Sequence, residues 1–137
     1  MQTNGFDIRV LPSCSIEDHY AHLLRLDYLD RCLFFSVGND DRAVDAHCLR
    51  LLSSQAIVIG AYADGRLRAS VEIVPDRAGT SAAATLIAEH DYQSDALAEA
   101  MIDRARDEAV KHRLGRLDFV GMTGEPQTIR AQMARFG

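Results

Sequence analysis

Hydrophobic positions along this chain recur at two spacings, and each spacing predicts a different kind of element. Alternating or continuous short apolar runs, which are typical of strands, cover residues 6–11, 57–62, 66–75, 82–88 and 116–122. Apolar residues three and four apart, which are typical of helices, cover residues 15–31, 42–53, 96–115 and 126–136. The chain is therefore expected to alternate between the two kinds of element.

The clearest local signal is a hairpin around Asp64 and Gly65. These two residues adopt positive φ at low cost, so they favour a type I′ turn between two strands. On the returning strand an apolar set alternates with a polar set: the apolar set is Leu67, Ala69, Val71 and Ile73, and the polar set is Arg66, Arg68, Ser70 and Glu72. We expect the apolar set in the core and Glu72 on the solvent side, paired with the neighbouring arginines.

Helix ends are indicated by capping residues. Ser15 and Asp41 are expected N-caps, Gly115 an expected C′ glycine, and Pro126 an expected first-turn residue. The long helix that begins near residue 96 has an apolar face expected on the core, made by Leu97, Met101, Ala105 and Ala109 and flanked by Ile102 and Val110. Its start follows Gln93, Ser94 and Asp95, and Asp95 is a candidate N-cap.

The predicted order is β-α-α-β-β-β-α-β-α, with an antiparallel hairpin and one β-α-β crossover over residues 82–122. This order predicts an α+β fold, an α/β three-layer arrangement around a mixed sheet. At 137 residues the chain suits one domain, over residues 6–137, after a flexible tail at 1–5.

Composition narrows the classes of protein further. The chain is 47% hydrophobic and 26% charged, as in ordinary globular domains, and its net charge of −5 argues against a nucleic-acid partner. The longest apolar stretch, residues 56–63, is too short to span a membrane, and the first residues lack the features of a signal peptide, so a cytoplasmic protein is expected. The odd count of three cysteines, with no CxxC spacing, predicts reduced thiols and no metal site.

Four pieces of sequence carry a resemblance to a known family. The first helical region contains residues 22–27 and 31–35, Asp64-Gly65-Arg66-Leu67 lies in the hairpin, Gln93-Ser94-Asp95-Ala96-Leu97-Ala98 precedes and opens the long helix, and Arg135-Phe136-Gly137 ends the chain. With the order of elements, they resemble the GNAT superfamily of acyl-CoA-dependent N-acetyltransferases. The resemblance implies a GNAT-like sheet and acetyl-CoA as cosubstrate. It also implies that the pantetheine lies along Leu86, Ile87 and Ala88, and the pyrophosphate at residues 93–98, where helix N–H groups favour an anion.

The sequence also departs from the family pattern. Ala96 replaces the first glycine of the pyrophosphate turn, and Asp95 places a carboxylate where the family often has a basic residue. At three positions where family members commonly carry catalytic residues, this chain has Ala83, Pro126 and Met133, so the usual catalytic residues are replaced. Glu72, His90 and Tyr92 are the remaining catalytic candidates. Each also has a structural interpretation: a surface charge pair for Glu72, a solvated residue for His90, and a ring packed under a turn for Tyr92.

Two hypotheses of different class follow. The first is an N-acetyltransferase that moves acetyl from acetyl-CoA to an amine of a small molecule or a protein. The second is a non-catalytic module of the same fold that binds a ligand or a partner in a regulatory role. Compared with the family, the last strand pair is apparently lacking, and the exposed sheet edge that this would leave suggests a homodimer.

Overall fold

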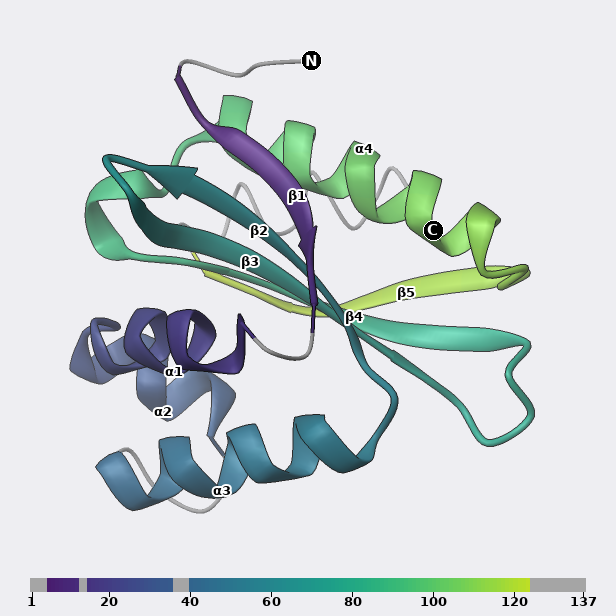
Figure 1. Ribbon diagram of the computed structural model, residues 1–137, viewed down its shortest axis with the longest axis horizontal. Coiled ribbons are helices and arrows are strands. Elements are labelled where there is room, and N and C mark those ends of the chain that lie inside the picture. Colours follow the sequence, from purple (N-terminus) through teal and green to yellow (C-terminus); the bar gives the residue numbers. More distant parts are fainter. Residues whose placement is uncertain (1–4, 13–14, 36–39, 124–137) are drawn as a thin grey trace.

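A sheet of five strands is the middle layer of the protein (Figure 1). The computed structural model describes residues 5–12, 15–35 and 40–123. The strands are β1 (Asp7–Leu11), β2 (Ile57–Ala63), β3 (Arg66–Pro75), β4 (Ser81–Ala88) and β5 (Arg116–Met122). They lie in the order β1-β2-β3-β4-β5, and all neighbours are antiparallel except β4 and β5, which are parallel.

Helices cover both faces of this sheet (Figure 1). One face carries α1 (Ile16–Leu24), α2 (Tyr28–Phe34) and α3 (Asp41–Ser53), and the other carries α4 (Asp95–Lys111). A short 3₁₀ turn, η2 (His90–Tyr92), joins β4 to α4. The predicted α+β three-layer class with a mixed sheet is confirmed, and the predicted helix at 126–136 lies outside the described residues.

The hairpin between β2 and β3 has the predicted turn. Asp64 and Gly65 both have positive φ, 54° and 73°, as a type I′ turn requires. Ala69, Val71 and Ile73 of β3 pack in one core cluster with Met101 and Ile102 of α4, both of which are fully buried. A second cluster, around Leu23, Val44 and Ile87, lies between the sheet and the first three helices.

The predicted helix at 15–31 is instead two helices. Asp27 adopts an extended conformation, and its side chain accepts a hydrogen bond from the N–H of Asp30, so it caps α2. α1 has already ended at Leu24. A residue that matched the helical spacing therefore starts a new helix, because its carboxylate competes for backbone N–H groups. α3 is capped by Asp40, one residue before the predicted Asp41.

Both ends of α4 also differ from the prediction. Ser94, rather than Asp95, is the N-cap, and its Oγ accepts from the N–H of Leu97.

At the C-terminal end of α4, Arg113 takes the left-handed conformation (φ 59°) that was expected of Gly115. The N–H of Leu114 bonds to Ala109 O, as in a Schellman motif, whereas Gly115 donates to Thr80 O at the start of β5. Val110, predicted to flank the core face, is 75% exposed.

Glu72 was predicted on the solvent side, and this was wrong. It is only 4% exposed, because α1 and α3 cover the face of β3 that carries it. Its carboxylate lies 2.7 Å from Nε2 of His19 on α1 and 2.8 Å from Nε2 of His47 on α3. Burial alone would raise the pKa of Glu72, but the hydrogen bonds from these two histidines outweigh it and hold the pKa at about 2. The ionised carboxylate only accepts, so both Nε2 atoms donate.

We expect this lowered pKa to appear in the pH dependence of stability. The carboxyl has an ordinary value of 4.5, so its contribution is fully present above about pH 4.5 and is lost as the pH falls towards 2. A shift of this size corresponds to about 3 kcal/mol. In urea titrations Glu72→Gln should lower the free energy of unfolding by about that amount at pH 7, and the difference from the wild type should shrink below pH 4.5.

Glu17→Gln is the matched control for Glu72→Gln, because Glu17 is an exposed carboxylate on α1. It should change the free energy of unfolding by less than about 0.5 kcal/mol. A Glu72→Gln variant as stable as the wild type at pH 7 would contradict the role given to the buried carboxylate.

Candidate functional site

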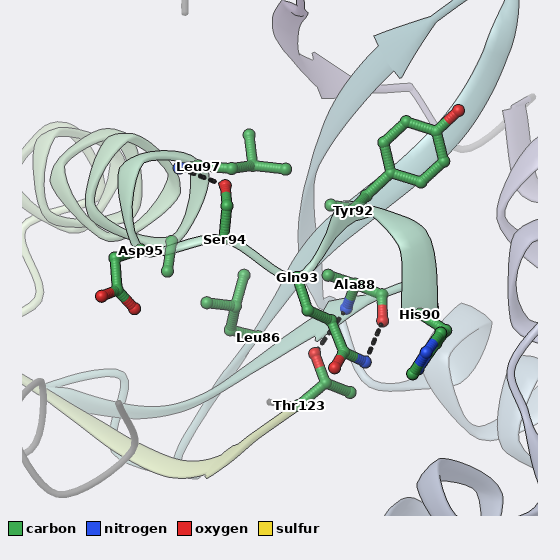
Figure 2. A pocket seen from close by; sticks show the side chains of 11 residues that line it. Leu86, Ala88, His90, Tyr92, Gln93, Ser94, Asp95, Leu97 and Thr123 are labelled. Carbon is green, nitrogen blue, oxygen red and sulfur yellow. Dashed lines mark hydrogen bonds between the residues drawn. The ribbon is translucent and has the colours of Figure 1, made fainter. Parts of the chain in front are cut away.

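A cavity of about 400 Å³ lies where β4 ends and α4 begins (Figure 2). Its walls come from β3, β4, the turn around η2, the first turn of α4 and the residue that follows β5. The lining residues are Ala69, Leu86, Ala88, His90, Tyr92, Gln93, Ser94, Asp95, Leu97, Ala98 and Thr123.

The cavity opens where the ladder between β4 and β5 stops. The last parallel pair is Leu86 with Met122. Beyond it Thr123 takes over, because its N–H donates to Leu86 O (3.0 Å) and its Oγ1 accepts from the N–H of Ala88 (2.8 Å). A side chain thus replaces the backbone partner that a continuing strand would supply.

Gln93 completes the hydrogen bonding at the end of β4. Its Nε2 donates to Ala88 O (3.1 Å) and to Oδ2 of Asp30 on α2 (3.0 Å) (Figure 2 shows the first of these bonds). Burial raises the pKa of the Asp30 carboxyl, and the nearby Asp27 raises it further. Both backbone polar groups of Ala88 therefore have partners within the protein, and the turn is joined to α2.

The first turn of α4 forms the opposite wall. The N-terminus of a helix favours negative charge, because its N–H groups point out of the helix and its dipole is positive there. The side-chain Oγ of Ser94 accepts a hydrogen bond from the N–H of Leu97, and its carbonyl accepts one from the N–H of Ala98. Asp95 lines the cavity and adds a negative charge, whereas Ala96 lines a different groove, beside Ile8 on β1.

Most of the residues predicted to bind the cofactor meet at this cavity. Those that line it are Leu86, Ala88, Gln93, Ser94, Asp95, Leu97 and Ala98. Ile87 does not, because alternation along β4 turns it to the opposite face, where it packs in the cluster beneath α1 and α3. Thr123 was missed, although a hydroxyl residue placed directly after a predicted strand was the available signal.

The three catalytic candidates are found in different surroundings. His90 lines the cavity with a side chain that is 76% exposed, and its Nδ1 lies 3.6 Å from Oδ2 of Asp27. Tyr92 also lines the cavity, and its ring packs edge-on to Phe6 and beneath the guanidinium of Arg68. Glu72 lies away from the cavity, in the buried layer beneath α1 and α3.

Other kinds of site find no support in the part of the chain that the structure describes. No three or more histidine, cysteine or acidic side chains gather there in a way that would hold a metal ion. Within residues 5–12, 15–35 and 40–123, no helix has the length and apolar character needed to cross a membrane. Of the described cysteines, Cys32 is exposed and Cys48 is buried, and burial raises the pKa of the Cys48 thiol to about 11.

Comparison with known proteins identifies the fold. No protein-family model and no curated protein sequence matches the chain. Among solved structures it is similar to a ribosomal-protein-alanine N-acetyltransferase from Brucella melitensis, with a TM-score of 0.64, 21% identity, and coverage of 96% of this chain and 91% of that one. A predicted acetyltransferase with acetyl-CoA from Clostridium acetobutylicum gives a TM-score of 0.64 at 14% identity, covering 96% and 88%.

A third similar structure is an acetyltransferase of the GNAT family from Streptococcus pneumoniae. It gives a TM-score of 0.63 at 17% identity, and the match covers 93% of this chain and 79% of that one. This protein therefore has the fold of these acetyltransferases, which is the fold that the resemblance implied.

Proposed function

We propose that this protein is an acyl-CoA-dependent N-acetyltransferase that acts on an amine of a small molecule or a protein. The observation that carries the proposal is the cavity between the end of β4 and the start of α4, in a sheet of GNAT topology. Acetyl-CoA would supply the activated acetyl group. The protein would supply the position of the reactants and the groups that move protons.

The residues around the cavity fit such a cosubstrate in part. Leu86 and Ala88 offer an apolar strand edge to the pantetheine, and the first turn of α4 offers its positive end to the pyrophosphate. Because Thr123 and Gln93 already occupy the polar groups of Ala88, pantetheine amides would have to replace these two side chains as partners. Asp95 would oppose the phosphates by charge.

His90 is the group that we assign as the general base. In the transfer, a C–N bond forms between the amine and the acetyl carbon, the C–S bond breaks, and the thiolate leaves with the electron pair while the amine loses a proton. Asp27, at 3.6 Å from Nδ1, favours the tautomer that carries its hydrogen on that atom. Nε2 of His90 is then available to accept the proton at the mouth of the cavity.

A second candidate function is the binding of a ligand or partner without catalysis. It is favoured by the same observation that weakens the first: Asp95 lines the cavity, and Ala88 has all its backbone hydrogen bonds within the protein. In this interpretation the cavity holds a ligand that is not a phosphate.

The first experiment compares thermal unfolding with and without millimolar acetyl-CoA. A ligand at 100 times its Kd adds about 2.7 kcal/mol to the stability of the native state. For a chain of this size each kcal/mol raises the Tm by roughly 2–4 °C. We expect a rise of several degrees with acetyl-CoA and a smaller rise with pantetheine, which lacks the nucleotide. An unchanged Tm would favour the second candidate.

The charge of Asp95 should limit the affinity for acetyl-CoA. We expect Asp95→Arg combined with Ala96→Gly to tighten binding at least tenfold by calorimetry. Since Asp95 lines the cavity and Ala96 does not, Asp95→Asn alone should give a clear gain and Ala96→Gly alone a small one. If none of the three variants changes the affinity, the first turn of α4 is not a phosphate site.

The role of His90 can be separated from binding. His90→Gln should lower kcat by about 10²- to 10⁴-fold, the range of general acid–base catalysis, with little change in the affinity for acetyl-CoA. Asp27→Asn should lower kcat less, and asparagine keeps the cap on α2. Wild-type kcat in the His90→Gln variant would exclude His90 as the base.

A further inference from the structure

Glu89 occupies the junction between β4 and the turn that carries the cavity. It follows the last residue of β4 and precedes η2. Its N–H donates to Arg68 O (3.0 Å), and its carbonyl accepts from the N–H of Tyr92 (2.8 Å). The backbone of Glu89 is thus held by β3 on one side and by the turn on the other.

The side chain of Glu89 gathers three donors from two other elements. Nη1 of Arg68, on β3, lies 3.0 Å from Oε1. Nε of Arg25, directly after α1, lies 3.0 Å from Oε2, and Nδ1 of His22, within α1, lies 2.9 Å from the same oxygen. Arg25 also donates to Leu67 O (2.6 Å). One buried carboxylate therefore joins α1, β3 and the end of β4.

The charges in this group are consistent with that arrangement. Burial alone would raise the pKa of Glu89, but its bonds with His22 and Arg25 outweigh burial, so its pKa is lowered and the carboxylate is ionised. Burial lowers the pKa of His22, against the effect of Glu89. A neutral His22 that donates from Nδ1 has an acceptor at Nε2, and this atom lies 3.2 Å from the hydroxyl of Ser70.

Arg68 extends the group to the cavity wall. Its guanidinium carbon lies 5.1 Å from the centre of the Tyr92 ring, within the range of a cation–π contact. Tyr92 lines the cavity, as do Ala88 and His90, which flank Glu89 in the chain. Glu89 is thus next in the chain to two lining residues, Ala88 and His90, and its carboxylate is linked to a third, Tyr92, through Arg68.

We propose that Glu89 is a positioning residue, which fixes residues 90–93 against α1 and β3 and so sets the shape of the ligand cavity. It acts through Arg68 and the backbone, and touches no ligand. The proposal rests on the proposed function only for the choice of acetyl-CoA as the probe.

The test compares Glu89→Gln with Glu108→Gln. Both carboxylates are buried, at 6% and 5% exposure, and both lie among basic side chains, but Glu108 is near the far end of α4, beside Arg104, Lys111 and His112. Two quantities are measured: the affinity for acetyl-CoA by calorimetry, and hydrogen–deuterium exchange of peptides that cover residues 88–98. Arg68→Met serves as a second variant, because methionine keeps an unbranched side chain and removes the guanidinium that lies over the Tyr92 ring.

We expect Glu89→Gln and Arg68→Met to weaken acetyl-CoA binding at least tenfold and to speed exchange over residues 90–93. Glu108→Gln should change neither, although its Tm falls. If all three variants lose affinity and protection in proportion to their loss of Tm, Glu89 is merely structural and the proposal is wrong.

The two proposals can fail separately. If the wild type does not bind acetyl-CoA, the proposed function fails, and the exchange measurement alone decides the role of Glu89. Exchange over residues 90–93 that is unchanged in both Glu89→Gln and Arg68→Met would then overturn the positioning role.

Discussion

Covering both faces of the sheet is the constraint from which the rest of the structure follows. A strand alternates its side chains between two faces, so β3 buries Ser70 and Glu72 of its polar set as well as its apolar set once α1 and α3 lie over it. Buried charges are costly without partners, and the helices supply them: histidines for Glu72, and a histidine and an arginine for Glu89. The polar side chains beneath α1 therefore bind the helices to the sheet and also support the turn that lines the cavity.

The cavity shows the same rule at a strand end. Where β4 and β5 stop pairing, the freed backbone groups of Ala88 are bonded by Thr123 and Gln93 rather than left to solvent. Side chains can exchange such bonds with a ligand more readily than a strand can, because no ladder has to break. Thr123 and Gln93 are thus side chains that a ligand could displace, and among the described lining residues Asp95 carries the carboxylate that opposes an anion.

Features that depend on a few neighbouring residues could be predicted from the sequence, whereas features that depend on contacts between distant residues mostly could not. The hairpin turn and the bounds of β5 could be predicted because turn chemistry and alternation act over a few residues. The spacing of residues 15–31 fits one continuous helix, but Asp27 caps a new helix, α2. Spacing alone could not show this, because an aspartate can occupy either a helical position or an N-cap. The surroundings of Glu72 could not be predicted, because alternation separates two faces without telling whether the second face is covered. Most of the cavity followed from the family resemblance, and Thr123 did not, since its role depends on where two strands part.

The bond between Gln93 and Asp30 links residues that are 63 positions apart in the chain, and so makes α2 part of the energetics of the cavity. Thermodynamic reciprocity then applies: if displacing α2 from the turn changes the affinity of the cavity for a ligand by some factor, that ligand changes the equilibrium of the displacement by the same factor. Because Asp30 is partly buried and its pKa is raised, this link also responds to the ionisation of a single carboxyl. Through Asp30, α2 can therefore influence the affinity of the cavity for a ligand, although none of its described residues lines the cavity.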